Sequence, residues 1–226
     1  MTLAETAYAA LRADILRGAF RPDQPLRLAQ LRDRYGLGFS PLREALTRLT
    51  ADRLVVSEAL RGFRVAPLSA EELRDMMETR IFIETEALRR SIARGGDDWE
   101  AGIVAALHAL TLQSRRAQAA DPASLEALEG RHRDFHAALI AACGSRQLLG
   151  IFDGLYLRSA RYRAPWLTRS EALPARDLEA EHSAIAQAAL ARDPDRAAAL
   201  LAEHYRRTIA ILDATAPERL AEAGAR

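Results

Sequence analysis

The chain has one cysteine and no lysine, and all 32 of its basic residues are arginine. A single cysteine, Cys143, cannot form an internal disulfide, which fits a reducing compartment. No apolar run approaches the ~20 residues that a helix needs to cross a bilayer. The N-terminal segment is amphipathic and carries acidic residues, unlike a signal sequence. We therefore expect a cytoplasmic protein with no membrane partner.

Several catalytic patterns are also missing. The sequence has no glycine-rich phosphate loop, no paired cysteines and no readable Ser-His-Asp set. His132 and His136 have the spacing of a zinc-hydrolase helix, but Arg133 stands where such an enzyme needs a glutamate general base. We therefore predict a protein that binds ligands and catalyses no reaction. An all-α metalloenzyme acting on a small carboxylate is the alternative.

The charges are unevenly distributed along the 226 residues, a length that allows two modest domains or one large one. Residues 1–67 contain 11 arginines against seven acidic residues, and the remaining 159 residues contain 21 arginines against 24 acidic residues. The net charges of +4 and −3 agree with the +1 of the whole chain. A basic segment before an acidic remainder favours a polyanion-binding module attached to a second unit.

Residues 31–67 have the pattern of a winged helix-turn-helix. Gly36 is expected to end a first helix, because glycine adopts the left-handed conformation at little cost. Ser40 is then expected to cap a second helix, with Pro41 at its first helical position. Two β-prone stretches follow, and Arg61-Gly62 joins them as the tip of a wing.

The second helix of this motif is predicted to be the DNA-recognition helix. Its apolar residues share one face, which leaves Arg43, Thr47 and Arg48 outward, as in a helix that enters a major groove N-terminal end first. A glycine between wing arginines allows close approach to phosphate or to the minor groove. The candidate DNA-binding residues are Ser40, Pro41, Arg43, Thr47, Arg48, Arg61, Gly62 and Arg64.

The rest of the chain is predicted to be helical. An amphipathic helix closed by Gly18 precedes the motif, and residues 26–28 are expected to form a short edge strand. After Pro67, Ser69 and Glu72 have the spacing of a capping box. The helical periodicity then predicts six helices in an antiparallel bundle, at about 70–94, 98–120, 123–142, 146–163, 175–191 and 194–214. The expected fold is mainly α, with a winged domain over 1–67 and an all-helical domain over 69–226.

Four of the five histidines are spaced as candidate metal ligands. His132 and His136 lie one turn apart on the same helix face, while His182 and His204 occupy the last two predicted helices beside apolar residues. If these helices share an interior, the imidazoles converge in a way that suits zinc or nickel. In the other interpretation they are hydrogen-bonded core residues, and the pocket holds an acid without metal.

Arg80 in the first bundle helix is a candidate effector-binding residue. An arginine directed into a bundle needs a carboxylate, either Glu84 four residues on or a bound acid. An exposed ion pair with Glu84 fits the spacing equally well.

Several segments resemble a known family. GLGFSPLREALTRLTADRLV, RGFRVAPLS and LRADILRGAFRPDQPLR resemble GntR-type bacterial transcription regulators. HRDFHAALIAACGSRQLL and EHSAIAQAALARDPDRAAALLAEH resemble the all-helical FCD ligand domain of their FadR subgroup. The resemblance implies a homodimeric repressor or activator, of which we expect a repressor, on a pseudo-palindromic DNA operator. It also implies a divalent metal, often zinc, with a small carboxylate effector bound at or near it.

Two positions depart from the family pattern. His136, His182 and His204 match its metal ligands, but His132 replaces the acidic residue or Asn that is usual four residues before the first of these. Phe39 stands where many relatives have arginine. Arg43 matches the recognition-helix arginine of the family, and Gly62 matches its wing glycine.

Overall fold

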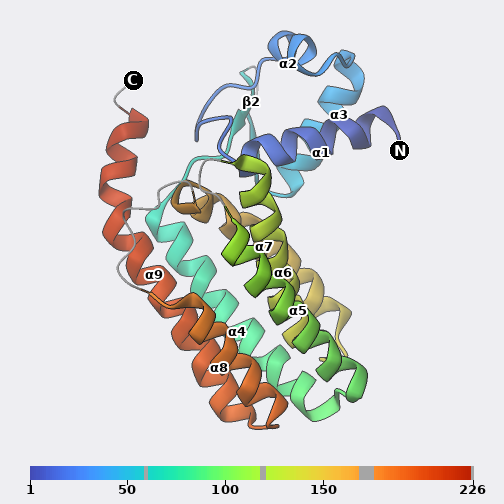
Figure 1. The fold of residues 1–226 in the computed structure, drawn as a ribbon. Coiled ribbons are helices and arrows are strands. Elements are labelled where there is room, and N and C mark those ends of the chain that lie inside the picture. Colours follow the sequence, from blue (N-terminus) through green and yellow to red (C-terminus); the bar gives the residue numbers. More distant parts are fainter. Residues whose placement is uncertain (59–60, 118–120, 168–175, 225–226) are drawn as a thin grey trace.

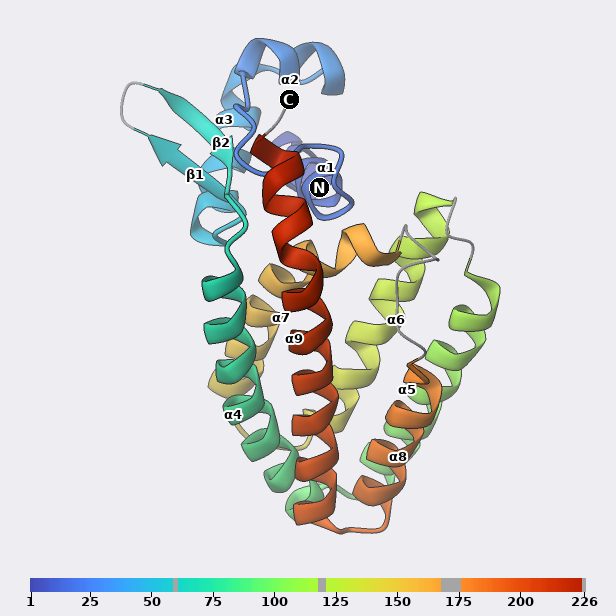
Figure 2. The same cartoon turned by 90° about the vertical axis from the view of Figure 1, so that its left-hand side faces the viewer.

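A computed structural model describes residues 1–58, 61–117, 121–167 and 176–224; for Pro122, 163–167 and 212–224 it describes the backbone alone. The described chain forms a winged unit and a helical bundle below it (Figures 1 and 2). The winged unit contains α1 (Leu3–Leu16), α2 (Leu28–Tyr35), α3 (Phe39–Ala51), β1 (Val55–Glu58) and β2 (Gly62–Val65). The bundle contains α4 (Ala70–Arg94), α5 (Asp97–Arg116), α6 (Pro122–Ile140), α7 (Arg146–Leu167), α8 (Leu178–Leu190) and α9 (Pro194–Gly224). The mainly helical fold is thus as predicted.

The winged unit has its own apolar core. Three helices and the antiparallel β1–β2 ribbon enclose it, with Val55 paired to Val65 at the base of the wing. The edge strand predicted at 26–28 is displaced toward the N-terminus. Residues 24–26 pair with β2 through the bridge between Pro25 and Arg64, flanked by hydrogen bonds from the Leu26 N–H to the Phe63 oxygen at 2.8 Å and from the Val65 N–H to the Gln24 oxygen at 2.9 Å. The pairing stops there because α2 begins at Leu28.

The turn between α2 and α3 differs from the prediction in one detail. Gly36 ends α2 in the left-handed conformation, φ +66°, as expected. The cap of α3, however, is Gly38, and no side chain caps this helix. Ser40 and Pro41 therefore lie inside its first turn. Glycine is an acceptable cap in extended conformation, and a proline in the first turn loses only an N–H that has no intrahelical partner.

Residues 66–69, the junction, connect the two units and contact α7. Ser69 caps α4 by accepting from the N–H of Glu72 at 3.3 Å. The reciprocal half of the predicted capping box is absent here, because the N–H of Ser69 donates to the Tyr162 hydroxyl at 3.2 Å. Arg161 donates to the carbonyl oxygen of Ala66. Helix α7 therefore binds the junction at two points.

The bundle encloses a second, larger apolar core, to which every one of its helices contributes buried residues. Most helix positions agree with the periodicity, but α7 passes Pro165 to end at Leu167, and α9 extends to Gly224. The predicted ends near 120 and 175 lie outside the described residues. No helix in the described ranges is long and apolar enough to cross a membrane.

Candidate DNA-binding face and histidine centre

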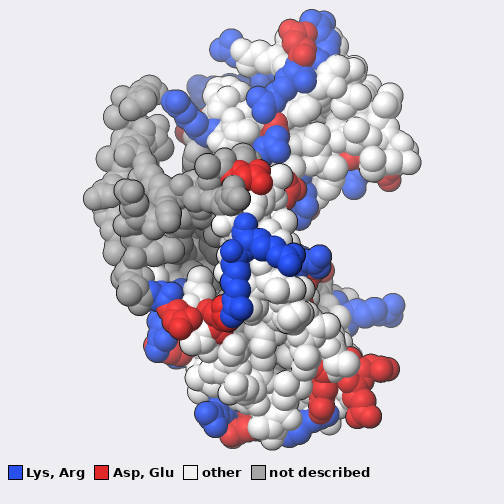
Figure 3. Space-filling model, viewed as in Figure 1, with Lys and Arg blue, Asp and Glu red and all other residues white. Residues whose placement is uncertain are grey.

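Helix α3 buries one face and exposes the other. Its four core residues are fully covered, namely Leu42, Ala45, Leu46 and Leu49. Ser40, Arg43, Thr47 and Arg48 are exposed. In Figure 3, arginine side chains gather over the upper part of the molecule, where Figure 1 draws α2 and the wing. The fold thus presents one side of α3 to solvent within a basic region.

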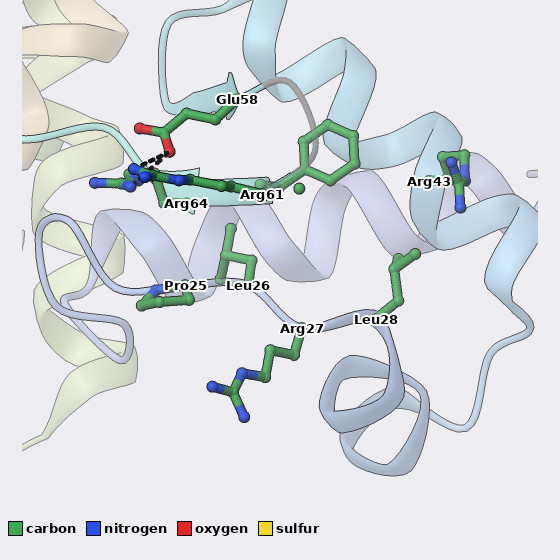
Figure 4. Close-up of a pocket in the computed structure, with 10 residues that line it drawn as sticks. Pro25, Leu26, Arg27, Leu28, Arg43, Glu58, Arg61 and Arg64 are labelled. Carbon is green, nitrogen blue, oxygen red and sulfur yellow. Dashed lines mark hydrogen bonds and ion pairs between the residues drawn. The ribbon is translucent and has the colours of Figure 1, made fainter.

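A cleft of about 440 Å³ lies between α3, the wing and the segment before α2 (Figure 4). Four arginines from these three segments line it, together with Gly62: Arg27, Arg43, Arg61 and Arg64. Arg27 was not among the predicted DNA-binding residues, although it lines the same cleft. The cleft brings a recognition-helix arginine and the wing arginines onto one surface.

The two wing arginines differ in how they are held. Arg64 pairs with Glu58 at 2.7 Å and with Asp23 at 3.1 Å, so that it ties the wing to the preceding loop. Arg61 lies 3.9 Å from Glu58 and its side chain is 79% exposed. Arg61 can therefore reach a polyanion at little cost, while Arg64 shapes the wing.

Four other candidates do not line the cleft, namely Ser40, Pro41, Thr47 and Arg48. Thr47 donates to the carbonyl oxygen of Arg43 at 2.9 Å, within α3 itself. The Arg48 guanidinium lies 4.5 Å from the ring centroid of Tyr8, and so contacts α1. Ser40 is exposed at the start of α3. Their contacts with DNA remain predictions.

The four selected histidines converge inside the bundle. His132 and His136 come from α6, His182 from α8 and His204 from α9, and one nitrogen of each lies within 4.8 Å of the others. Three are buried and His132 is half-buried. We call this group the histidine centre. About 3.4 Å separates ligand nitrogens around a tetrahedral ion at ~2.1 Å, so the group is close to the size that such an ion needs.

Hydrogen bonds fix the outward nitrogen of three rings. The Nδ1 atoms of His132, His136 and His204 lie 2.7 Å from the Tyr156 hydroxyl, 3.0 Å from the Tyr205 hydroxyl and 2.9 Å from a Glu181 oxygen, respectively. A ring whose Nδ1 donates a hydrogen bond keeps the lone pair on Nε2 for a metal.

The inward nitrogens of the two α6 histidines face each other, and that of His182 is unsatisfied. His132 Nε2 and His136 Nε2 are 3.2 Å apart, and two lone pairs at this distance repel unless a cation lies between them. His182 Nε2 is buried with no hydrogen-bond partner among the described residues. A buried, unsatisfied nitrogen is costly. These residues therefore fit a divalent ion.

Burial lowers the pKa of three of the imidazoles, those of His136, His182 and His204, and so keeps them neutral. It lowers the pKa of His182 to about 3, with the positive potential of His204 as a second cause. Burial, followed by the potential of the neighbouring histidines, lowers the pKa of His136 well below its ordinary value. Burial raises the pKa of Glu181, but hydrogen bonds from His204 and Arg176 outweigh it and leave that pKa well below the usual range. His204 is therefore neutral and lies beside the ionised carboxylate of Glu181. A metal ion binds an imidazole in this neutral form.

Arg80 is directed into the bundle and pairs there with Glu84, so of the two interpretations the exposed ion pair is wrong. Its Nε lies 2.7 Å from Glu84, and both side chains are almost completely covered. Arg80 also donates to the hydroxyls of Ser159 and Tyr205, at 3.0 and 2.8 Å. The Tyr205 hydroxyl donates to Glu84 at 2.5 Å and accepts from His136. Arg80 thus contacts the histidine centre through Tyr205.

The polar residues that support the centre, Tyr205, Glu181 and Arg176, were not predicted from the sequence. Tyr205 follows His204 directly, but adjacent helix positions point about 100° apart, so adjacency does not predict a shared site. Arg176 holds Glu181 with two hydrogen bonds of 2.9 and 2.6 Å. These contacts depend on how α8 packs against α9, so the sequence alone does not predict them.

A winged helix-turn-helix with an arginine-lined cleft, fused to a helical bundle around a polar centre, defines a DNA-binding transcription regulator. Residues 3–65 match the family model described as bacterial regulatory proteins, gntR family, and residues 75–207 match the FCD domain model. The chain therefore belongs to the GntR family and carries an FCD domain. Members of these families are regulators, so the metalloenzyme alternative is wrong.

Named relatives agree with this assignment. The HTH-type transcriptional repressor GlaR of Escherichia coli (strain K12) is 41% identical over 211 residues, covering 91% of this chain and 93% of GlaR. The uncharacterized HTH-type transcriptional regulator BphR of Paraburkholderia xenovorans (strain LB400) is 40% identical over 212 residues, covering 93% and 85%. The structure of E. coli McbR/YncC shares the fold, with a TM-score of 0.76 at 21% identity over 95% of this chain and 99% of that chain.

Proposed function

We propose that this protein is a cytoplasmic, homodimeric repressor of the FadR subgroup that senses a small carboxylate at a metal-containing centre. Residues 1–67 bind DNA, and residues 69–226 bind the effector and dimerise. The convergence of four histidines inside the bundle carries the proposal. GlaR is named a repressor, which supports repression rather than activation by this protein.

On DNA, each subunit inserts α3 into a major groove. A two-fold dimer then recognises a pseudo-palindromic operator. Arg43 contacts a base edge, with Ser40, Pro41, Thr47 and Arg48 beside it. The wing residues contact the backbone or the minor groove, namely Arg61, Gly62 and Arg64.

The Arg43→Ala variant is expected to bind its operator about 5- to 100-fold more weakly, the cost of one good base contact. Affinity is measured by band shift on the intergenic region upstream of the gene. Arg90→Ala is the control, because Arg90 is a surface residue of α4 paired only with Glu86 among the described contacts. Unchanged affinity in Arg43→Ala would refute its assigned role.

In the bundle, the four histidines hold the ion, with zinc as first and nickel as second candidate, since imidazole suits both. A bound divalent ion supplies positive charge that attracts a carboxylate. Because none of the four ligands carries negative charge, that attraction is not reduced by the ligands themselves. Arg80 is the proposed effector-binding residue, and it is linked to the centre through the Tyr205 hydroxyl, which accepts from both Arg80 and His136.

Removing His132 tests the departure from the family pattern. We expect His132→Ala to weaken zinc binding by at least about 10-fold, since even the loss of a hydrogen-bond partner of a metal ligand costs that much, without abolishing it, because three buried imidazoles remain. Competition with a chromophoric chelator measures the change. The matched control is His108→Ala, since His108 is exposed on α5 away from the centre. Equal affinity in both variants would mean that His132 does not coordinate.

Helix α7 couples the two units in this proposal. Within two of its turns, Tyr156 contacts His132 of the histidine centre and Ser159 accepts from Arg80. Arg161 and Tyr162 contact the junction in the same stretch. A shift of α7 on effector binding therefore changes the support of the winged unit. The effector alters DNA affinity only by its differential affinity for the two arrangements.

A further inference from the structure

Phe39 is a large apolar residue at the first position of α3, and the core does not use it. It is 48% exposed, whereas the four core leucine and alanine residues of the same helix are fully covered. Its ring has a defined neighbour, because the Arg32 guanidinium of α2 lies 5.4 Å from the ring centroid. Arg32 is itself held by Asp33 through two hydrogen bonds of 2.9 and 3.0 Å. The ring is therefore held at the surface.

The position of Phe39 on α3 connects it with DNA binding. Phe39, Arg43 and Thr47 follow one another at intervals of four residues, so they occupy successive turns on one side of the helix. All three are exposed, and Arg43 lines the cleft next to the wing. An α3 that presents Arg43 to a groove also presents the Phe39 ring, at its N-terminal end.

We propose that Phe39 is a specificity-determining residue that contacts a thymine methyl group in the major groove. Thymine is the base with a methyl group on its major-groove edge, and phenylalanine is among the side chains that contact it. The contact with Arg32 keeps the ring from folding onto the protein and places a cation beside the DNA backbone. The inference rests on the proposed role of α3 as recognition helix.

Deoxyuridine substitution tests this contact, because it removes the methyl group and leaves base pairing intact. Each thymine of the operator is replaced in both half-sites, and the full-length protein is titrated by fluorescence anisotropy. For the wild type we expect one position at which the substitution weakens binding by about fourfold per half-site, the effect of one buried methyl group. For Phe39→Ala we expect that response to disappear.

Two controls keep the result interpretable. Phe82→Ala removes another exposed phenylalanine, 74% exposed on α4 of the bundle, and should retain the wild-type response. Phe39→Ala should melt like the wild type by circular dichroism, because its side chain is outside the core. A methyl response that persists in Phe39→Ala, or that is absent in the wild type, overturns the proposal.

Arg43→Ala separates this proposal from the proposed function. If Arg43→Ala binds weakly while Phe39→Ala keeps the methyl response, α3 remains the recognition helix and the Phe39 contact is wrong. If Arg43→Ala binds the operator normally, the assignment of α3 is wrong, and the Phe39 contact is overturned with it.

Discussion

Protein carrying His182→Ala together with His204→Ala is expected to bind zinc at least about a thousandfold more weakly than the wild type and to be purified without metal. Zinc sites with four protein ligands bind with roughly 10–16 kcal/mol, so the loss of two ligands removes a large share of that free energy. Only the two α6 imidazoles would remain. Elemental analysis of protein purified without a nickel column measures the content, and titration with zinc measures the affinity.

Two comparisons complete this experiment. The His108→Ala variant should retain wild-type metal content, which shows that removing any histidine is not sufficient. A wild-type protein that carries no metal and takes up none would contradict the metal centre. The four imidazoles would then be core residues, and the effector would bind without an ion.

Neutralising Glu84 is expected to cost about 3–5 kcal/mol in the free energy of unfolding, the range for one partner of a buried ion pair. Glu84→Gln keeps the side-chain volume but leaves Arg80 buried without a countercharge. Arg80 is fully covered, and its Nε lies 2.7 Å from the Glu84 carboxylate. Urea unfolding followed by circular dichroism measures the change.

The same helix offers a matched control for Glu84. Glu86 pairs with Arg90 at 2.8 Å and the same four-residue separation, but the two side chains are 46% and 43% exposed. Glu86→Gln should therefore change the unfolding free energy by about 0.5 kcal/mol or less. If Glu84→Gln and Glu86→Gln lowered the free energy of unfolding by similar amounts, the claim that burial makes the Arg80–Glu84 pair important for stability would be wrong.

Local signals predicted most of the secondary structure. Gly36 ends α2 as expected, because a left-handed C-terminal residue is a property of the local sequence. The start of α3 was misplaced by two residues, since Gly38 and Ser40 are both acceptable caps. Local chemistry could not decide between two neighbouring caps of similar cost.

The histidine centre was predictable in part. The four-residue spacing of His132 and His136 places both rings on one face of α6, so their proximity follows from the helix period. The distance from that face to His182 and His204 depends on how α8 and α9 pack. Spacing also fits a buried and an exposed Arg80–Glu84 pair equally well, so the burial of Arg80 became visible only in the fold.

The contacts between α7 and the junction have a consequence for how such regulators diversify. Arg161 donates to the carbonyl oxygen of Ala66, and Tyr162 accepts from the N–H of Ser69, so both bonds use main-chain atoms of the junction. Main-chain atoms are the same whatever side chains the neighbouring positions carry. The residues of the winged unit that contact bases can therefore change during evolution, which gives such a regulator new target promoters. The hydrogen bonds between the junction and α7 are kept while they change.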